Sequence, residues 1–354
     1  MADLNDLDQI KSLDKSNLLG SIQSLGDQVK QAWEETQALL IDTNYCTGIE
    51  NIVVAGMGGS GLNAHIFKSL FTKQLKVPFE IVNGYQLPEY VNDKTLVVLS
   101  SFSGSTEETI AAGKQAVERG AKITGLCSGS TLGDFLKGGG YPSYIFDPKF
   151  NPSNQPRMGL GYTIIGLTGL LIKLGFAKVE DNFSEQILNS VAAAGKDYGI
   201  ESTLAKEVAQ KLKDHFAIIV GSEFLTGNAH AFANQTNENA KTFSAYHLVP
   251  ELNHHLLEGL TNPATLKTNV QVILLESDSY IEKNKARYEV TKKILDKQQI
   301  PYYSLNLTGS EIEQSFRVLV FGSYVTFYLA LLYDLDPTPI PWVDFFKEEL
   351  KKIS

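Results

Sequence analysis

Short apolar runs that alternate with helical stretches place the strongest constraint on the fold of this chain. In the first half these runs span residues 52–55, 79–82, 95–99 and 123–126. Helical stretches follow the first and third runs, through Leu70 and Arg119. Most of the runs are continuously apolar, which is typical of strands whose sheet is covered on both faces, and alternation with helices favours parallel pairing. The pattern predicts an α/β fold built on a parallel sheet.

A second set of apolar runs predicts a second unit of the same kind. These runs span residues 216–220, 270–275 and 302–305. Residues 52–56 are similar to residues 218–221. Residues 97–101 are similar in the same way to residues 272–277. The similarity is weak, but it suggests a duplicated unit whose second copy has lost the Ser/Thr-Gly loop of the first.

The length of the chain favours two domains, because a domain holds about 100–200 residues and the chain has 354. We expect the first domain over residues 46–176 and the second over residues 213–354. The polar, helix-forming residues 177–212 are expected to form a helical connection between them.

Both ends of the chain are expected to be helical. Residues 1–45 contain apolar side chains at spacings of three and four, namely Ile22, Leu25, Val29 and Trp33. Such a stripe packs one face of a helix against a larger body. Residues 342–352 are expected to form the closing helix.

Composition excludes several classes of protein. The chain has 40 acidic and 31 basic side chains and a net charge of −9, whereas a nucleic-acid-binding surface is basic. Its longest stretch without a charged residue, 51–67, has 17 residues including four glycines, which is unsuited to crossing a bilayer. The acidic N-terminus lacks the apolar core of a secretory signal, and two cysteines cannot form a disulfide framework. We expect a cytoplasmic enzyme that binds neither nucleic acid nor membrane.

Two polar loops follow strands of the first unit, and each opens a helix. The first contains Gly58, Gly59 and Ser60. The second contains Ser101, Ser103 and Thr106. Ligands of an open parallel sheet bind beyond the carboxyl ends of its strands, and the free N–H groups of a helix N-terminus favour an anion. Neither loop contains lysine, so the pattern predicts a site for a single phosphoryl group rather than for a nucleoside triphosphate.

Two alternatives remain for these loops. Residues 56–61 also fit the dinucleotide fingerprint G-x-G-x-x-G after a strand. That fingerprint requires an acid at the end of the next strand, where Asn83 and Gly84 stand, with Glu80 earlier in the strand. In the second alternative, the serines only cap helices. Helix capping is a common role for any single serine, but it is a less common explanation for two such loops together.

Taken together, the two loops resemble those of the sugar isomerase (SIS) domain, which binds phosphorylated sugars. Further motifs follow in order at residues 155–157, 159–172, 237–241, 250–254 and 336–339, with Lys347 last. This ordered set resembles the bifunctional phosphoglucose/phosphomannose isomerase family over about residues 45–354. The resemblance implies two tandem SIS-type, doubly wound parallel-sheet (flavodoxin-like) domains after an N-terminal helical extension.

The resemblance also implies a role for each matching residue. The phosphate group of the sugar would be bound by Gly58, Gly59, Ser60, Ser101, Ser103 and Thr106. Glu238 would move the proton between C1 and C2, and Arg157 would stabilise the enediolate. His254 would open the sugar ring with help from Lys347. The family forms homodimers with the site at the subunit interface, and His254 would come from the partner chain.

The chemistry of aldose–ketose isomerisation agrees with this set of residues. One carboxylate with a tuned pKa is enough to move the proton, a neutral histidine can open the ring, and a fixed cation stabilises the enediolate. The reaction requires no metal or other cofactor, and the adjacent His254 and His255 cannot readily chelate one ion. We therefore expect a metal-independent, cofactor-free isomerase of glucose 6-phosphate and fructose 6-phosphate, and also of mannose 6-phosphate. The alternatives are a non-catalytic sugar-phosphate-binding regulator and an isomerase of another phosphosugar.

Each of these four residues also has a purely structural interpretation. Glu238 could be a solvated helix residue, and His254 a structural histidine. Arg157 could form a structural ion pair, and Lys347 could belong to the solvated face of its helix.

The chain departs from the family pattern at a few positions. His255 stands where the family usually has asparagine, so two adjacent imidazoles, His254 and His255, are candidates for opening the ring. Residues 230–233 lack the basic side chains expected there, and Asn63 and His65 replace small residues. These departures bear on the range of substrates more than on the type of reaction.

Overall fold

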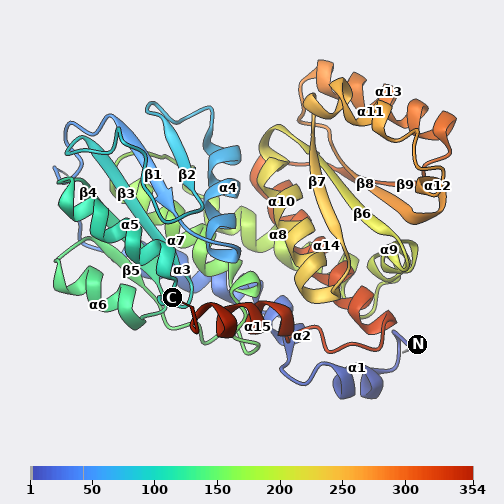
Figure 1. Cartoon of the computed structure of the whole chain (residues 1–354), viewed down its shortest axis with the longest axis horizontal. Coiled ribbons are helices and arrows are strands. Elements are labelled where there is room, and N and C mark those ends of the chain that lie inside the picture. The colour runs from blue at the N-terminus through green and yellow to red at the C-terminus, as the bar shows by residue number, and fades with distance from the viewer. Residues whose placement is uncertain (1–2, 43, 354) are drawn as a thin grey trace.

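Two parallel sheets form the framework of the protein (Figure 1). A computed structural model describes residues 3–42 and 44–353 of the chain. The first sheet has the order β2-β1-β3-β4-β5, and the second has the order β7-β6-β8-β9. The strands of the first sheet are β1 (Asn51–Ala55), β2 (Phe79–Val82), β3 (Thr95–Ser101), β4 (Lys122–Cys127) and β5 (Ser143–Ile145). Those of the second are β6 (Phe216–Ser222), β7 (Ser244–Val249), β8 (Val270–Ser277) and β9 (Tyr302–Leu307).

Helices cover both faces of the first sheet. They are α4 (Gly59–Phe71), α5 (Glu107–Glu118), α6 (Ser130–Gly138), η1 (Pro156–Met158) and α7 (Leu160–Lys173). Val53 and Val97 belong to a cluster with residues of α5 and α6, whereas Ile52 and Leu96 belong to a cluster with residues of α4 and α7. Successive side chains of a strand point to opposite faces, so both faces of these strands are buried and their central residues are continuously apolar.

The second sheet lies among a larger set of helices. Before it come α8 (Phe183–Tyr198) and α9 (Leu204–Leu212). Those within or after it are η2 (Glu223–Leu225), α10 (Thr226–Ala240), η3 (Glu251–His254), α11 (Leu256–Gly259), α12 (Leu266–Asn269), α13 (Glu282–Gln298), α14 (Glu311–Leu332) and α15 (Pro341–Leu350). Helix α10 packs on β6 and β7, and α14 packs on α8, α9 and α10.

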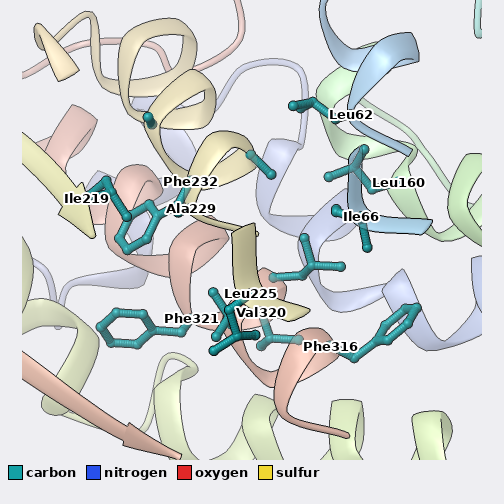
Figure 2. Packing of buried hydrophobic residues seen from close by; sticks show 14 of the residues in the cluster. Leu62, Ile66, Leu160, Ile219, Leu225, Ala229, Phe232, Phe316, Val320 and Phe321 are labelled. Carbon is teal, nitrogen blue, oxygen red and sulfur yellow. The ribbon is translucent and has the colours of Figure 1, made fainter. Parts of the chain in front are cut away.

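The two halves share one hydrophobic core. Leu62 and Ile66 of α4, Ala229 and Phe232 of α10, and residues of α7 and α14 belong to a single buried cluster (Figure 2). Gly227 of α10 packs directly against α4. A Cβ atom on it would lie 2.5 Å from the backbone N of Ile66. Glycine at this position therefore lets the two helices pack backbone to backbone.

Helix α14 is the one described helix that is long and apolar enough to cross a membrane. However, 94% of its apolar window is buried inside the protein, against α8, α9 and α10. A helix that is apolar all round is expected in the core of a large protein, and α14 has that place here.

All seven predicted strands are present, and two more were not expected. Most extend by one or two residues beyond the predicted runs. Strands β5 and β7 lie at edges of their sheets, where a strand needs less apolar surface. Strand β7 reads Ser-Ala-Tyr-His-Leu-Val, and most of its side chains are only partly buried.

The N-terminal segment is helical as expected but is divided into α1 (Leu7–Leu13), α2 (Leu18–Gln23) and α3 (Leu25–Gln37). The Asp14 carboxylate accepts hydrogen bonds from the N–H groups of Leu18 and Leu19, and Asn17 caps α2 in a left-handed conformation. Such side chains compete with the helix backbone and interrupt it. The predictions for residues 1, 2, 43 and 354 lie outside the described residues.

The two sheets repeat one strand plan, as the weak similarity of the halves predicts. Strand β1 lies between β2 and β3, and β6 lies between β7 and β8. A Cβ atom on Gly56 would meet the carbonyl oxygen of Ser60, and one on Gly221 would meet that of Leu225, at the same spacing of four residues. Gly58 and Glu223, two residues after each glycine, both have positive φ, at 50° and 45°.

Glu223 fills the loop of the second copy with its own side chain. Its Oε1 accepts hydrogen bonds from the backbone N of Ile281 at 3.0 Å and from Asn284 Nδ2 at 2.8 Å. Asn284 Nδ2 also donates to Ser222 Oγ at 3.2 Å. The second copy therefore carries a carboxylate where the first has a glycine-containing loop.

Candidate active site

The two predicted phosphate loops lie side by side at the carboxyl edge of the first sheet. Gly58 caps α4 with φ of 50°, and Gly59 begins the helix. A Cβ atom on Gly59 would lie 3.1 Å from the backbone N of Arg157, so the start of α4 lies against η1. Thr106 caps α5 at the neighbouring strand. Two helix N-termini thus meet at one edge, where their dipoles favour an anion.

Hydroxyl groups hold these two loops together. Ser60 Oγ accepts a hydrogen bond from the backbone N of Phe102 at 2.7 Å, and Ser101 Oγ lies 2.8 Å from Thr106 Oγ1. Both serines are buried. Ser103 is exposed, and its Oγ lies 3.1 Å from Ser105 Oγ. The buried hydroxyls therefore shape the loops, while Ser103 and the partly buried Thr106 lie nearer the surface.

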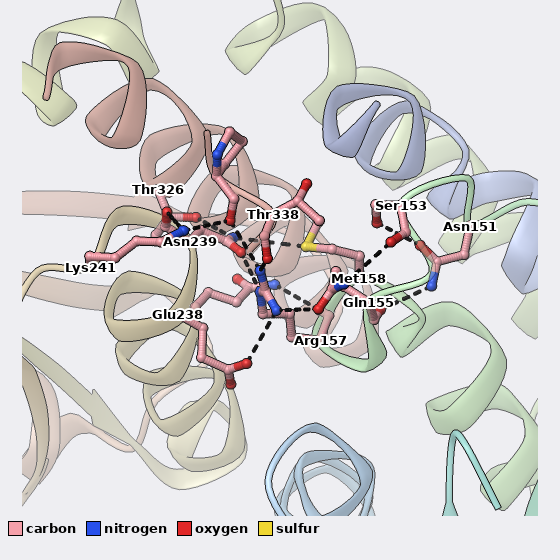
Figure 3. A network of polar contacts seen from close by, with 12 residues as sticks. Asn151, Ser153, Gln155, Arg157, Met158, Glu238, Asn239, Lys241, Thr326 and Thr338 are labelled. Atoms are coloured by element: carbon pink, nitrogen blue, oxygen red, sulfur yellow. Dashed lines mark hydrogen bonds and ion pairs between the residues drawn. The ribbon is translucent and has the colours of Figure 1, made fainter. Parts of the chain in front are cut away.

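Arg157 is buried behind the loops, with 1% of its side chain exposed. Its guanidinium lies at the centre of a polar network between the two halves (Figure 3). Nη1 lies 3.3 Å from Glu238 Oε2, so the structure brings together two of the predicted catalytic residues. One comes from η1 of the first half and the other from α10 of the second, 81 residues later.

Glu238 has the properties of a general base. Burial raises the pKa of its carboxyl above 4.5, while the positive charges of Arg157, Lys347 and Lys241 oppose this rise. Its side chain still has 29% of its surface exposed. A carboxyl with a raised pKa and partial access is suited to accepting a proton from a bound molecule near neutral pH.

Lys347 and Lys241 complete the positive surroundings of Glu238. Lys347 is exposed on α15, and its charge acts on the Glu238 carboxyl. Lys241 ends α10 in a left-handed conformation, and its Nζ donates to three carbonyl oxygens, those of Asn239, Asp336 and Pro337, at 3.0–3.1 Å. Burial lowers the pKa of Lys241 to about 8. Lys241 had no predicted role, although it lies in the motif at 237–241.

His254 lies far from Glu238 within one chain. Glu238 is near the end of α10, beside the start of β7, where Ser244 N donates to Asn237 Oδ1 at 3.1 Å. His254 is exposed in η3, beyond the other end of β7. Because β7 has six residues, with a rise of about 3.3 Å between neighbours, its first and last residues are about 17 Å apart. The structure thus separates this predicted catalytic residue from the other three.

Two departures from the family pattern contact each other across the halves. The rings of His65 on α4 and His230 on α10 lie with centroids 4.6 Å apart, and Tyr246 of β7 stacks on His230 at 4.5 Å. Burial lowers the pKa of His230 to about 4, and the neighbouring His65 acts in the same direction. The pKa of His65 is also lowered by burial. Sequence alone could flag both residues but could not show that they pair.

No metal-binding cluster is found among the described residues. Over 3–42 and 44–353, no three or more His, Cys, Asp and Glu side chains are grouped in a way that could hold an ion.

Known proteins resemble this chain in both sequence and structure. Residues 201–350 match the bacterial phospho-glucose isomerase C-terminal SIS domain, and residues 47–134 match the SIS domain. A bifunctional phosphoglucose/phosphomannose isomerase of Caldicellulosiruptor bescii is 31% identical over 341 residues, which cover 94% of this chain and 99% of that protein. One from Aquifex aeolicus is 30% identical over 308 residues, or 86% and 92% of the two chains. A hypothetical protein of Thermus thermophilus has a similar structure, with a TM-score of 0.73 at 18% identity over 95% of this chain and 90% of that one.

The two parallel sheets and the phosphate-type loops define a protein with two SIS domains. The extent and level of sequence identity narrow this class further. The chain belongs to the bifunctional phosphoglucose/phosphomannose isomerase family.

Proposed function

We propose that the chain interconverts glucose 6-phosphate and fructose 6-phosphate, and also mannose 6-phosphate and fructose 6-phosphate, through a cis-enediol. The observation that carries the proposal is the pair of Arg157 and Glu238, which lies against the start of α4 at the edge where two helix N-termini meet. The names of the relatives support the substrates. In this proposal the chain acts in the cytoplasm and requires no metal or other cofactor.

The loops would bind the 6-phosphate and leave C1 and C2 of the open-chain sugar near Glu238. Gly58, Gly59, Ser103 and Thr106 would meet the phosphate at the surface, and the buried Ser60 and Ser101 would keep the two loops in place. The helix dipoles of α4 and α5 stabilise the negative charge of the phosphate there. Binding of the phosphate group, at a distance from C1 and C2, orients these carbons toward Glu238. The phosphate itself takes no part in the reaction.

Glu238 would then take the proton from C2 of the aldose. The electron pair of that C–H bond forms the C1–C2 double bond, and the carbonyl oxygen on C1 takes the negative charge. Arg157 stabilises this charge. The hydroxyl proton on O2 then moves to O1, and return of the carbon-bound proton from Glu238 to C1 gives the ketose, with a hydroxyl on C1 and a carbonyl on C2. Glucose and mannose 6-phosphates differ only at C2, so both give the same enediol, and one base serves both.

The proposed assembly is a homodimer in which each site is completed by the other chain. Ring opening would be performed by His254 of the partner subunit, since Glu238 and His254 of one chain lie at opposite ends of β7. Helix α15 supports this assembly because none of its residues is buried and Trp342, Phe345 and Phe346 are 79%, 55% and 62% exposed. Exposed aromatic side chains of this kind mark interaction surfaces. Lys347 lies on the same helix and would assist ring opening.

An isomerase assay tests the proposal directly. EDTA-treated protein is incubated with fructose 6-phosphate, and glucose 6-phosphate and mannose 6-phosphate are measured separately. Both products support the full proposal, and glucose 6-phosphate alone refutes the mannose activity. A Glu238→Gln variant should lose about 10²–10⁴-fold in kcat while remaining folded. Binding of the sugar phosphate without either product would instead indicate a regulator.

A further inference from the structure

The guanidinium of Arg157 has an acceptor for every N–H. A guanidinium carries five N–H donors. Nε donates to Asn239 Oδ1 at 2.5 Å, and Nη2 donates to the carbonyl oxygens of Pro337 and Thr338 at 3.1 and 2.8 Å. Nη1 donates to Gln155 Oε1 at 2.7 Å and to Glu238 Oε2 at 3.3 Å. A substrate oxygen can therefore bind Arg157 only by replacing one of these five acceptors.

One acceptor is easier to replace than the other four. Those four are carbonyl or amide oxygens, and two of them belong to the backbone at 337 and 338. The bond to Glu238 is the longest of the five, and 29% of the Glu238 side chain is exposed. The Nη1–H that points to Glu238 is therefore the donor that can turn to a bound molecule.

Asn239 holds the guanidinium in this orientation. It is fully buried, and its Oδ1 accepts the Nε–H of Arg157. Its Nδ2 donates to Thr326 Oγ1 of α14 at 3.0 Å and lies 3.8 Å from Met158 Sδ (Figure 3). Both ends of the amide are thus engaged, which prevents the side chain from rotating. Asn239 also follows Glu238 directly in α10, so one turn of helix carries both the base and the residue that fixes its cation.

We propose that Asn239 is a positioning residue for the isomerase reaction. It holds Arg157 in place so that only one of its donors, Nη1–H, can change its hydrogen-bond acceptor. This donor leaves the Glu238 carboxylate and binds the substrate oxygen as negative charge develops there. The same movement removes a hydrogen bond from the Glu238 carboxylate and makes it a stronger base when it must take the proton. The inference rests on the proposed isomerase function. It adds Asn239 as the residue that fixes the position of the Arg157 charge.

Three variants test this role. Asn239→Ala removes the acceptor of Nε, and Asn239→Asp keeps an acceptor but adds a negative charge beside Arg157. Asn237→Ala is the matched control. It lies on the same helix and loses hydrogen bonds with Ala233 and Ser244, but none with Arg157. The kinetic constants with fructose 6-phosphate and the pH profile of kcat/KM are measured for each, together with thermal unfolding.

Asn239→Ala should lower kcat by about 10- to 100-fold with less than a threefold change in KM, because the phosphate loops are untouched. Asn239→Asp should move the acidic limb of kcat/KM to higher pH, because a second anion near Glu238 favours its protonated form. Asn237→Ala should change kcat by less than about twofold.

Equal kcat in Asn239→Ala and Asn237→Ala, or an unmoved acidic limb in Asn239→Asp, would overturn the positioning role while leaving the isomerase intact. A wild-type chain without isomerase activity would refute the proposed function and this inference together. If Asn239→Ala does not fold, Thr326→Val replaces it, since it removes the support of Asn239 and should lower kcat in the same way. Full kcat in Thr326→Val would then refute the inference.

Discussion

At the scale of single residues, the electrostatics of the site depend on two buried charges, those of Arg157 and Glu238. Arg157 is fully buried and Glu238 is largely buried, and the guanidinium donates to four amide or carbonyl oxygens as well as to the Glu238 carboxylate. Removing one partner of such a pair leaves the other charge buried and uncompensated. The chemistry of the site therefore depends on neighbours that touch no substrate.

The raised pKa of Glu238 predicts the acidic limb of the activity. The base works as a carboxylate, so activity is present above its pKa and is lost as the pH falls through a value above 4.5. Lys347 opposes the rise of this pKa, so Lys347→Met should move the acidic limb of kcat/KM further upward, by less than about one unit. The pH profile with fructose 6-phosphate measures this shift. A limb that stays in place or moves downward would contradict the electrostatic assignment.

The His65–His230 pair predicts a loss of stability in mild acid. The pKa of His230 is lowered to about 4 by burial, so the unfolded chain binds a proton more readily and the free energy of unfolding falls as the pH drops from about 6.5 towards 4. His230→Phe keeps the ring between His65 and Tyr246 but cannot be protonated. The decrease in unfolding free energy between pH 7 and pH 5 should be smaller in this variant by about 1–2 kcal/mol.

Urea unfolding of both proteins at the two pH values measures the difference. His65 also has a lowered pKa, so part of the decrease should remain. An identical decrease in the two proteins would show that His230 does not carry the effect.

The candidate site could be predicted from the sequence only as far as its motifs extend. Arg157, Glu238 and Lys347 were predicted by resemblance, and the structure brings them together. Asn239 and Lys241 lie within a predicted motif, but neither was assigned a role, because a neutral amide and a lysine have many uses on a helix. Their contacts come from other parts of the chain: Asn239 bonds to Arg157 and to Thr326 of α14, and Lys241 bonds to the carbonyl oxygens of Asp336 and Pro337.

At the scale of elements, the meeting of α4 and α10 decides whether a site forms. The N-terminal end of α4 carries Gly59 and Ser60, and the C-terminal end of α10 carries Glu238. The two helices run against each other with Gly227 at the contact. Any change in their separation moves the predicted phosphate loop relative to Glu238.

Gly227→Ala should therefore damage both stability and activity. The added Cβ would lie 2.5 Å from Ile66 N and 2.6 Å from the carbonyl carbon of His65, and backbone atoms cannot move aside as a side chain can. We expect a loss of about 1–3 kcal/mol in unfolding free energy, together with a fall in kcat. Denaturant unfolding and the isomerase assay measure the two effects.

Gly195→Ala is the matched control for this change. Gly195 lies in α8, where an added Cβ would meet nothing within 4 Å. Alanine favours a helix more than glycine does, so this variant should be unchanged or more stable by up to about 1 kcal/mol. Equal behaviour of the two variants would show that the contact of α4 and α10 tolerates a methyl group.

The elements themselves were predictable where burial dictates the sequence. Most of the seven expected strands are apolar because helices cover them, and that pattern can be read without a structure. Strand β7 could not be predicted in this way, because its partly buried residues Tyr246 and His247 interrupt the apolar pattern. The division of the N-terminal helices depends on the hydrogen bonds of the Asp14 carboxylate, which periodicity does not reveal.

At the scale of the whole molecule, the separation of His254 from Glu238 predicts that two chains share each site. Mixing the inactive variants Glu238→Gln and His254→Ala tests this prediction. In a mixed dimer, one site would contain both substitutions and the other would contain neither. Random exchange makes half of the dimers mixed, so about one quarter of the wild-type activity should return.

The two variants are unfolded together, refolded as a mixture and assayed with fructose 6-phosphate. Each variant refolded alone should remain inactive. If the mixture is also inactive while wild-type protein recovers its activity after the same treatment, then His254 acts within its own chain or does not act at all.

The Glu223 loop shows what became of the second copy of the unit. In the proposed function, the donors of the first copy's loop bind the phosphate group of a sugar that enters and leaves with each turnover. In the second, the Glu223 carboxylate already occupies Ile281 N and Asn284 Nδ2. These hydrogen bonds, which could otherwise bind an anion from the solvent, instead stabilise the folded chain permanently. If the proposed function holds, the first copy exchanges its anion with the solvent, whereas the second carries a carboxylate of its own chain that cannot dissociate.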